Sequence, residues 1–276
     1  MRFGVSLTIY LISSAFEQLE GLYSLSGLIE ELGFDYLSVG HHVATPEGGN
    51  QSSPFVLSTG LAAPTRRLRL GAGIYILFLY HPAAVAEQTV TLEQMSNHRV
   101  KLRVSVGDRD YEFRGHGGDL KTRGARVDES ITALRVAWTT RRWRHKRRFC
   151  TIAAPEVRPP TVQRRVAATR QTVSEAAMPR IRHFLPHCRR AGVGADLKRS
   201  LCSRIAHRAD APLEEYASAR VRLGTADDVV TEVLRRRTEV GADYLHLVPS
   251  GPRLREMLTL FGKEVIPAVG DPGDAR

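Results

Sequence analysis

Residues 31–37, with the sequence ELGFDYL, recur 208 residues later as EVGADYL at residues 239–245. In each copy a glycine follows an apolar helical pattern, and a short run of strand-forming residues follows the glycine. Divided by six, the offset is about 35 residues, and one eighth of the 276-residue chain has about the same length. Eight βα units of that size close a TIM-type barrel. We therefore expect an α/β fold built as a (β/α)8 barrel.

Strand and helix patterns alternate on both sides of the two copies. The period of the apolar residues separates the two kinds of element, since strands alternate every two residues and helices every three to four. The expected strands cover residues 3–7, 36–39, 68–76, 100–106 and 244–248, and the expected helices cover residues 17–32, 54–62, 82–95, 225–240 and 254–261.

The middle of the chain, residues 141–210, lacks clear strands, and several prolines and many arginines interrupt its apolar runs. Barrel units five and six should lie here, so they are poorly formed in the sequence. We expect one barrel domain over residues 1–270 with this divergent, basic segment inside it, followed by a short tail over 271–276.

The positive charge of the chain is concentrated in its middle. The formal net charge is +11, but residues 98–210 hold 27 Lys and Arg against 10 Asp and Glu, whereas the remainder is slightly acidic. The extreme is RRWRHKRR at residues 141–148. Such a run could bind nucleic acid, with Trp143 stacking on bases. More often it is a solvated face or loop, so nucleic acid is not an expected partner.

The cysteines and histidines of the middle segment do not predict a metal or disulfide framework. Cys150, Cys188 and Cys202 are odd in number and form no CxxC pair, which favours a reducing, cytoplasmic location. His183, His187 and Cys188 have helical ligand spacing, but Pro186 interrupts that helix and no carboxylate is nearby, so no metal site is expected. No apolar run is long enough for a membrane span.

Polar and glycine-rich residues follow three neighbouring strands at their expected carboxyl ends. His41 and His42 follow the second strand, residues 71–73 (GAG) lie in the third, and residues 107–110 (GDRD) follow the fourth. In a TIM barrel the active site lies at these ends of the strands. The three groups should therefore line one rim.

These segments resemble the bacterial luciferase-like superfamily, which contains FMN-dependent monooxygenases and oxidoreductases that use coenzyme F-420. The resemblance covers about two-thirds of the chain, in the family's order and spacing. It is carried by LSVGHH at 37–42, LAAPTRRLRLGAGIYIL at 61–77, HPAAVAEQTVTLEQMS at 81–96, VGDRDYEFRGHGGDLKTRGARVDESITALRVAW at 106–138, and the C-terminal run from LGTADDVV to GKEVIPAV.

The resemblance implies a catalytic role for His42 and a cofactor-binding role for its neighbours. His42 falls on the family's histidine after strand two, which contacts the flavin or deazaflavin ring and can act as an acid or base. His41 falls where many members have aspartate. Gly73-Ile74 falls on a cis peptide bond that forms a backstop behind the ring.

Two further segments of the resemblance border the cofactor. Arg109 and the Glu112-Phe113 pair fall in the segment after strand four. Ser174 falls on a serine that begins a helix whose N-terminus holds the flavin phosphate. The implied chemistry is an oxidoreductase, and more narrowly a monooxygenase, acting on a small organic substrate. With FMN the reduced ring would react with oxygen, and with F-420 hydride would pass directly while His42 handles the proton. A homodimer is left open.

A second function stays open because the segment before Ser174 departs from the family pattern. Gln171, Thr172 and Val173 stand where members usually have glycines that bring backbone amides to the phosphate. The alternative is a family member with impaired cofactor binding that acts as a basic polyanion-binding or interaction protein.

Overall fold

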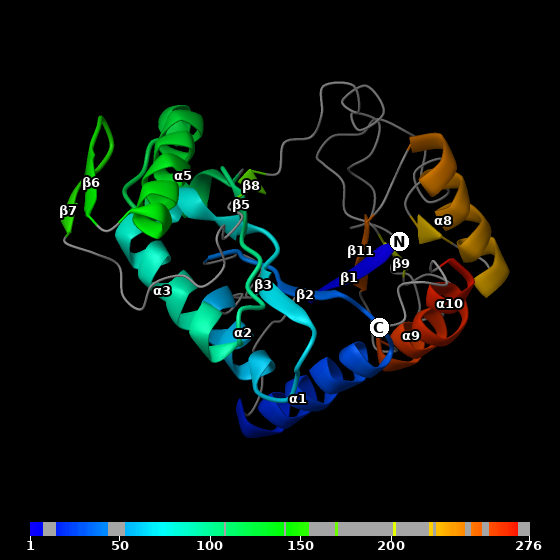
Figure 1. Ribbon diagram of the computed structural model, residues 1–276. Coiled ribbons are helices and arrows are strands. Elements are labelled where there is room, and N and C mark those ends of the chain that lie inside the picture. Colours follow the sequence, from blue (N-terminus) through cyan, green and yellow to red (C-terminus); the bar gives the residue numbers. More distant parts are fainter. Residues whose placement is uncertain are drawn as a thin grey trace. The chain divides into compact units, whose positions relative to one another are not determined.

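A computed structural model describes residues 1–7, 15–43, 53–107, 109–140, 142–154, 169–170, 201–202, 221–222, 225–240, 244–249 and 254–269 (Figure 1). The chain forms two compact units. The first consists of Met1–Leu7, Gly27–Tyr36 and Thr172–Arg276, and the second of Thr8–Ser26 and Leu37–Gln171. Among the helices of the described ranges, none combines the length and apolar character needed to cross a membrane.

The first unit is built around a parallel strand pair. Strand β1 (Arg2–Leu7) pairs in parallel with β11 (Tyr244–Pro249), with Phe3 opposite Leu245. The short strands β9 (Leu201–Cys202) and β10 (Val221–Arg222) extend β11 in antiparallel fashion. Its helices are α8 (Ala226–Val240), α9 (Leu254–Leu260), which continues through a π-helical turn over Phe261–Val265, and α10 (Ile266–Val269).

The ELGFDYL stretch ties a helix end to the first strand. Helix α1 (Ala15–Glu31) ends just before Gly33, whose φ of +84° is the left-handed conformation that glycine adopts most easily. Asp35 then exchanges two bonds with Phe3, one from its backbone N–H to the Phe3 carbonyl and one from the Phe3 N–H to its carboxylate, both 2.7 Å long. Phe34 stacks on the buried ring of Phe261, with ring centroids 5.8 Å apart. The junction predicted from sequence is thus confirmed.

The second unit holds parallel strands covered by helices, as Figure 1 shows. Strand β2 (Tyr36–Val39) lies beside β3 (Arg69–Ala72), and β5 (Arg103–Ser105) pairs in parallel with β4 (Tyr75–Ile76) and β8 (Thr169–Arg170). Its longer helices are α2 (Pro54–Ala62), α3 (Pro82–Met95), α4 (Asp110–Gly115) and α5 (Arg123–Thr139).

Helices α2 and α3 have the predicted bounds because a proline opens each one. Pro54 and Pro82 lie in the first turn, where no intrahelical donor is needed. The His81 side chain also accepts a hydrogen bond from the Ala83 N–H at the start of α3.

The core of the second unit joins its strands to the inner faces of α3 and α5. These side chains are almost wholly shielded from solvent, so they provide most of the hydrophobic stabilisation of this unit. The largest members are Phe55, Tyr75, Leu77, Phe78, Leu92, Leu102, Phe113, Leu134 and Trp143.

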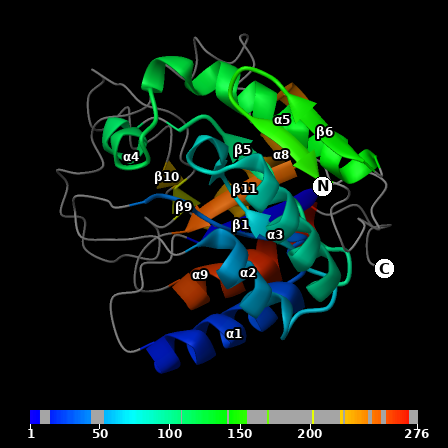
Figure 2. The same ribbon diagram turned by 90° about the vertical axis from the view of Figure 1, so that its left-hand side faces the viewer.

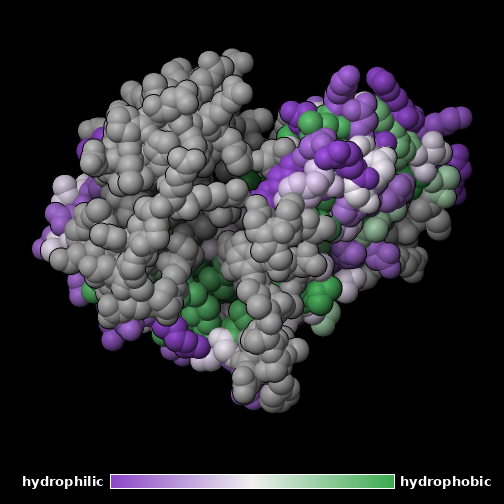
Figure 3. Space-filling model, turned by 180° about the vertical axis from the view of Figure 1, so that it is seen from behind, coloured by the Kyte–Doolittle hydropathy of each residue, from purple (hydrophilic) through white to green (hydrophobic). Residues whose placement is uncertain are grey.

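The expectation that residues 141–210 lack clear strands is wrong at the start of this segment. Strand β6 (Trp143–Lys146) and strand β7 (Thr151–Ala154) form an antiparallel hairpin beside α5 (Figure 2). Trp143 and His145 are buried, whereas Arg144 and Lys146 are exposed. The basic run is therefore a half-buried strand with a charged outer face. In the view of Figure 3 the described surface carries both hydrophilic and hydrophobic areas.

Candidate functional site

Three strand ends of the second unit meet through backbone and side-chain hydrogen bonds. The Gly73 N–H donates to the Val39 carbonyl at the end of β2, over 2.9 Å. The Ile76 N–H in β4 donates to Nδ1 of His41, over 3.1 Å. The peptide bond between Gly73 and Ile74 is cis, as the sequence predicts. His41 and the Gly73-Ile74 turn therefore lie together, as expected for neighbouring strand ends.

His41 is a buried, neutral imidazole with both ring nitrogens engaged. Nδ1 accepts from Ile76, so Nε2 carries the proton and faces the Tyr80 hydroxyl at 3.1 Å. The ring stacks on Tyr75, with centroids 4.8 Å apart. Burial lowers the pKa of His41 from 6.5 to about 4; Glu112 opposes this shift, and His42 and His116 add to it. His41 is thus held in a fixed orientation by its hydrogen bonds and does not carry a charge at neutral pH.

His42 makes the contact that defines the site. Its Nδ1 lies 3.2 Å from Oε1 of Glu112, which comes from helix α4. The same carboxylate oxygen accepts the backbone N–H of Val43 over 2.7 Å. An Nδ1 proton directed at Glu112 leaves Nε2 of His42 as the basic nitrogen of the neutral ring. About a fifth of the His42 side chain, 22%, is exposed, so a ligand can reach it.

Glu112 is a buried carboxylate with one oxygen still to be satisfied. Its side chain is inaccessible to solvent, and Oε2 has no hydrogen-bond partner within the part of the chain that the structure describes. Burial acts to raise the pKa of Glu112, but the hydrogen bonds from His42 and Val43 and the charges of His42 and Arg109 outweigh it and lower that pKa. The carboxylate is therefore ionised and able to stabilise a protonated His42.

The loop between β5 and α4 places Glu112 and Arg109. Gly107 has a φ of +76°, and a Cβ at this position would come within 2.9 Å of Ile76 and 3.0 Å of Phe113. Arg109, which is half-buried, donates from Nη1 to the Tyr111 hydroxyl over 2.6 Å. Its positive charge acts on Glu112, which brings the predicted Arg109 into the same electrostatic environment as His42.

Tyr75 and Tyr80 belong to this site but were not predicted from the sequence. Their rings are 4.9 Å apart, their hydroxyls are hydrogen-bonded, and burial raises the pKa of both above the usual value of 10. Both therefore remain protonated donors at neutral pH. The available signal was position, because Tyr75 follows the Gly73-Ile74 turn and Tyr80 precedes the proline that opens α3.

The remaining predicted residues divide into two groups. Phe113 packs on Phe78 in the core, with ring centroids 4.6 Å apart, so its side chain serves packing more than the site. Ser174 lies outside the described residues, as do His183, His187 and Cys188. The structure thus brings together His41, His42, the Gly73-Ile74 turn and the charge of Arg109, and adds Glu112 as the direct partner of His42.

Comparison with known proteins relates the chain to oxidoreductases. Residues 1–247 match the family described as luciferase-like monooxygenase. An F420-dependent glucose-6-phosphate dehydrogenase of Rhodococcus hoagii is 32% identical over 125 residues, which are 43% of this chain and 37% of that protein. The 4-hydroxyprotoasukamycin monooxygenase of Streptomyces nodosus subsp. asukaensis is 31% identical over 110 residues, 40% of this chain and 29% of that protein. These matches span only 29–37% of the relatives' length.

Solved structures share the fold over almost the whole chain. The monooxygenase RslO1 from Streptomyces bottropensis has a TM-score of 0.73 at 20% identity, with 97% of this chain and 99% of that chain covered. An F420-dependent secondary alcohol dehydrogenase has a TM-score of 0.71 at 16% identity, with 98% and 99% covered. At such identity the likeness is one of fold. It confirms the predicted α/β, TIM-type architecture.

Proposed function

This chain belongs to the family of luciferase-like monooxygenases, and from that membership we propose that it is an oxidoreductase that binds FMN or coenzyme F-420 at the site around His42. The observation that carries the proposal is the pair formed by His42 and Glu112. A partly exposed imidazole held by an ionised, buried carboxylate is an arrangement suited to taking up and returning a proton.

The residues present fit the ring of such a cofactor. The partly exposed imidazole of His42 offers a ring nitrogen, and the half-buried Gly73-Ile74 turn offers a face without a long polar side chain. His41 and Tyr80 lock each other in place beside this turn. When bound, the ring would supply the redox chemistry, either hydride transfer in F-420 or oxygen activation in reduced FMN.

The proton is the part of the reaction that this chain handles itself. Neutral His42 accepts a proton at Nε2 from a hydroxyl of a small organic substrate, or returns one to a carbonyl oxygen in the opposite direction. Glu112 stabilises the imidazolium formed in between and fixes the ring orientation. The buried ring of Tyr75 and the partly buried ring of Tyr80 would exclude water from one side of this exchange.

Two narrower forms of the activity have support. The resemblance of the sequence to a 4-hydroxyprotoasukamycin monooxygenase supports a monooxygenase, for which we propose FMN as the cofactor. The resemblance to F420-dependent glucose-6-phosphate dehydrogenases supports direct hydride transfer to or from an alcohol. The alternative of a basic interaction protein is not favoured, because the relatives of the chain are enzymes.

A cofactor titration separates these forms. The purified chain is titrated with FMN and with F-420 while the visible absorbance and fluorescence of each ring are followed, and turnover of a panel of small alcohols and ketones is then measured with and without oxygen. Saturable binding of F-420 with oxygen-independent turnover supports the dehydrogenase. Binding of reduced FMN with oxygen-dependent turnover supports the monooxygenase. Binding of neither ring at millimolar concentration contradicts the proposal.

A further inference from the structure

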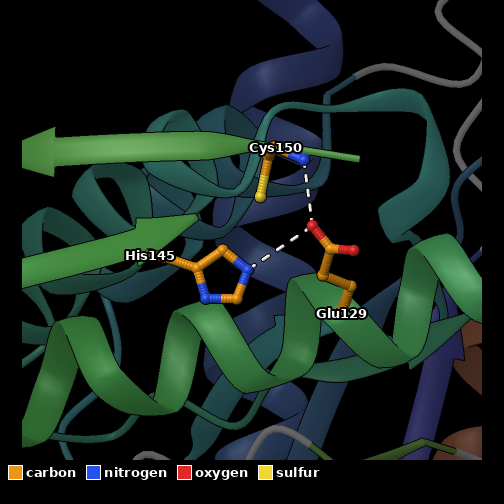
Figure 4. Close-up of side chains that lie close together, drawn as sticks. All are labelled: Glu129, His145 and Cys150. Carbon is orange, nitrogen blue, oxygen red and sulfur yellow. Dashed lines mark hydrogen bonds and ion pairs between the residues drawn. The ribbon is translucent and has the colours of Figure 1, made fainter. Parts of the chain in front are cut away.

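A second cluster of reactive side chains lies where the β6–β7 hairpin meets helix α5. Glu129 comes from α5, His145 from β6, and Cys150 from the turn just before β7 (Figure 4). The side chains of the first two are almost buried, whereas Cys150 is partly exposed. The cluster is separate from the site of His42, and the activity proposed above does not use it.

The cluster has the geometry of a metal site. One donor atom from each residue can be chosen so that all three lie within 4.8 Å of one another. Nε2 of His145 lies 3.4 Å from Oε1 of Glu129 yet makes no hydrogen bond. The ring is 7% exposed, so water does not readily satisfy this nitrogen either. A buried nitrogen that makes no hydrogen bond is costly, and this one is held only by its ion-pair contact with Glu129.

A bound ion would satisfy that nitrogen. Zinc binds imidazole nitrogen and carboxylate oxygen at about 2.0–2.2 Å and thiolate sulfur at about 2.3 Å, so ligand atoms around one tetrahedral ion lie roughly 3.3–3.8 Å apart. The distance between Nε2 and Oε1 already falls in this range. We propose that Glu129, His145 and Cys150 bind a Zn²⁺ ion with a fourth position open to water.

Backbone N–H groups around the cluster fix the orientation of the Glu129 carboxylate. Oε1 of Glu129 accepts the N–H groups of Phe149 and Cys150, over 3.0 Å and 2.9 Å. These bonds orient the carboxylate, and an ion bound at Oε1 would displace one of them. Arg126 lies nearby over the ring of Phe149, at 5.4 Å from its centroid.

The thiol must lose its proton when the ion binds. Zinc binding would replace this proton in the Cys150 sulfur–hydrogen bond by a sulfur–zinc bond, and the proton would pass to solvent. The bound ion would clamp the hairpin to α5.

Metal binding by variants tests the site directly. The full chain is dialysed against Zn²⁺ and its content measured by mass spectrometry of the metal, and Co²⁺ is titrated while the thiolate-to-cobalt charge-transfer band is recorded. We expect about one ion per chain and a clear charge-transfer band. Cys150→Ser should abolish the band, and His145→Gln should weaken binding by at least about tenfold.

The chain offers a matched control for these variants. His98 lies 3.6 Å from the buried Glu93, so it forms a His–Glu pair like that of His145 and Glu129, but it belongs to no three-ligand cluster found among the described residues. His98→Gln should leave metal binding unchanged. A charge-transfer band that survives Cys150→Ser, or that disappears equally in His98→Gln, would overturn the proposal.

A measurement on the unaltered chain guards against variants that fail to fold. Iodoacetamide modification of each cysteine is followed by peptide mass spectrometry with and without Zn²⁺. Zinc should slow alkylation of Cys150 at least about tenfold and leave Cys202 unaffected. Equal alkylation of Cys150 in both conditions, with no stoichiometric zinc, would contradict the proposal. The cluster would then serve only to connect the hairpin to α5 through hydrogen bonds.

Discussion

His42 and Glu112 are 70 residues apart in the sequence, yet their side chains meet at 3.2 Å. His42 follows β2, and Glu112 lies in the first turn of α4. The contact gives His42 a defined tautomer and places an ionised carboxylate against it. At the scale of single residues, we expect this pair to be the chemical centre of the proposed site.

Replacing His42 should therefore damage turnover far more than stability. General acid–base groups contribute about 10²–10⁴-fold in rate, so His42→Ala should lower kcat by at least about 100-fold. The side chain lies at a partly exposed loop position, so the free energy of unfolding should change by no more than about 1 kcal/mol. Steady-state kinetics and urea denaturation measure the two effects.

His98→Ala is the control for that experiment, because it removes a histidine from another His–Glu pair outside the site. It should leave kcat unchanged. If His42→Ala instead destabilised the fold by several kcal/mol and retained activity, His42 would be a structural residue.

His41 should make the fold sensitive to mild acid. Its pKa is about 4 in the folded chain and 6.5 ordinarily, so the unfolded chain binds the proton more readily. Its stabilising contribution is complete above pH 6.5 and is lost as the pH falls toward 4. The loss amounts to about 3 kcal/mol over that window.

The measurement is the free energy of unfolding at pH 7 and pH 4 for the natural chain and for His41→Gln. The amide cannot titrate, so the variant should lose about 3 kcal/mol less than the natural chain over this range. Identical pH dependence of the two proteins would contradict the assignment of His41 as a buried neutral ring.

At the scale of elements, the turn between β5 and α4 sets where Glu112 lies. The turn requires glycine at position 107 for two reasons. Its positive φ is strained for other residues, and its close neighbours, Ile76 and Phe113, leave no room for a side chain. Gly107→Ala should lower the free energy of unfolding by about 2–3 kcal/mol through backbone strain and overpacking. It should also reduce turnover, since α4 carries Glu112.

Gly115 provides the control, because it lies at the end of α4, the helix that follows Gly107, and a Cβ there meets no atom within 4 Å. Gly115→Ala should change the free energy of unfolding by no more than about 1 kcal/mol, in the stabilising direction. Thermal or chemical denaturation of the two variants checks the prediction. Equal effects at the two glycines would contradict it.

The β6–β7 hairpin was not predicted from the sequence, because its many charged residues were interpreted as a loop or solvated face. The run WRHK at 143–146 alternates buried and exposed residues, which is the period of a half-buried strand. The surrounding arginines obscured that signal. The burial of Trp143 and His145 against α5 depends on a packing partner elsewhere in the chain, which local composition does not show.

At the scale of the whole molecule, the charge distribution should govern cofactor binding. Residues 98–210 carry a net charge of +17, and the glycines expected before Ser174 are absent. Arginine side chains in this segment would then bind the cofactor phosphate in place of backbone amides. The candidates include Arg164, Arg165 and Arg170. Such pairs are screened by salt, whereas buried amides are affected much less.

We therefore expect the Kd for FMN or F-420 to rise by roughly tenfold between low and high salt, equivalent to about 1.4 kcal/mol. Fluorescence titration at 50 mM and 500 mM NaCl would measure this change in Kd. The Debye length differs about threefold between the two salt concentrations. Tight binding that does not respond to salt would show that an intact amide cradle holds the phosphate.

Local sequence alone determined most of the elements outside the β6–β7 hairpin, and the strand-end positions of His41, His42 and Gly73. Prolines fixed the starts of α2 and α3, a glycine fixed the end of α1, and the repeated helix–strand junction indicated the barrel. These features depend on φ, ψ and apolar period, which are properties of neighbouring residues. Only the tertiary structure paired His42 with Glu112 and gathered Glu129, His145 and Cys150. Those contacts join residues on separate elements, so they arise from packing that no local pattern encodes.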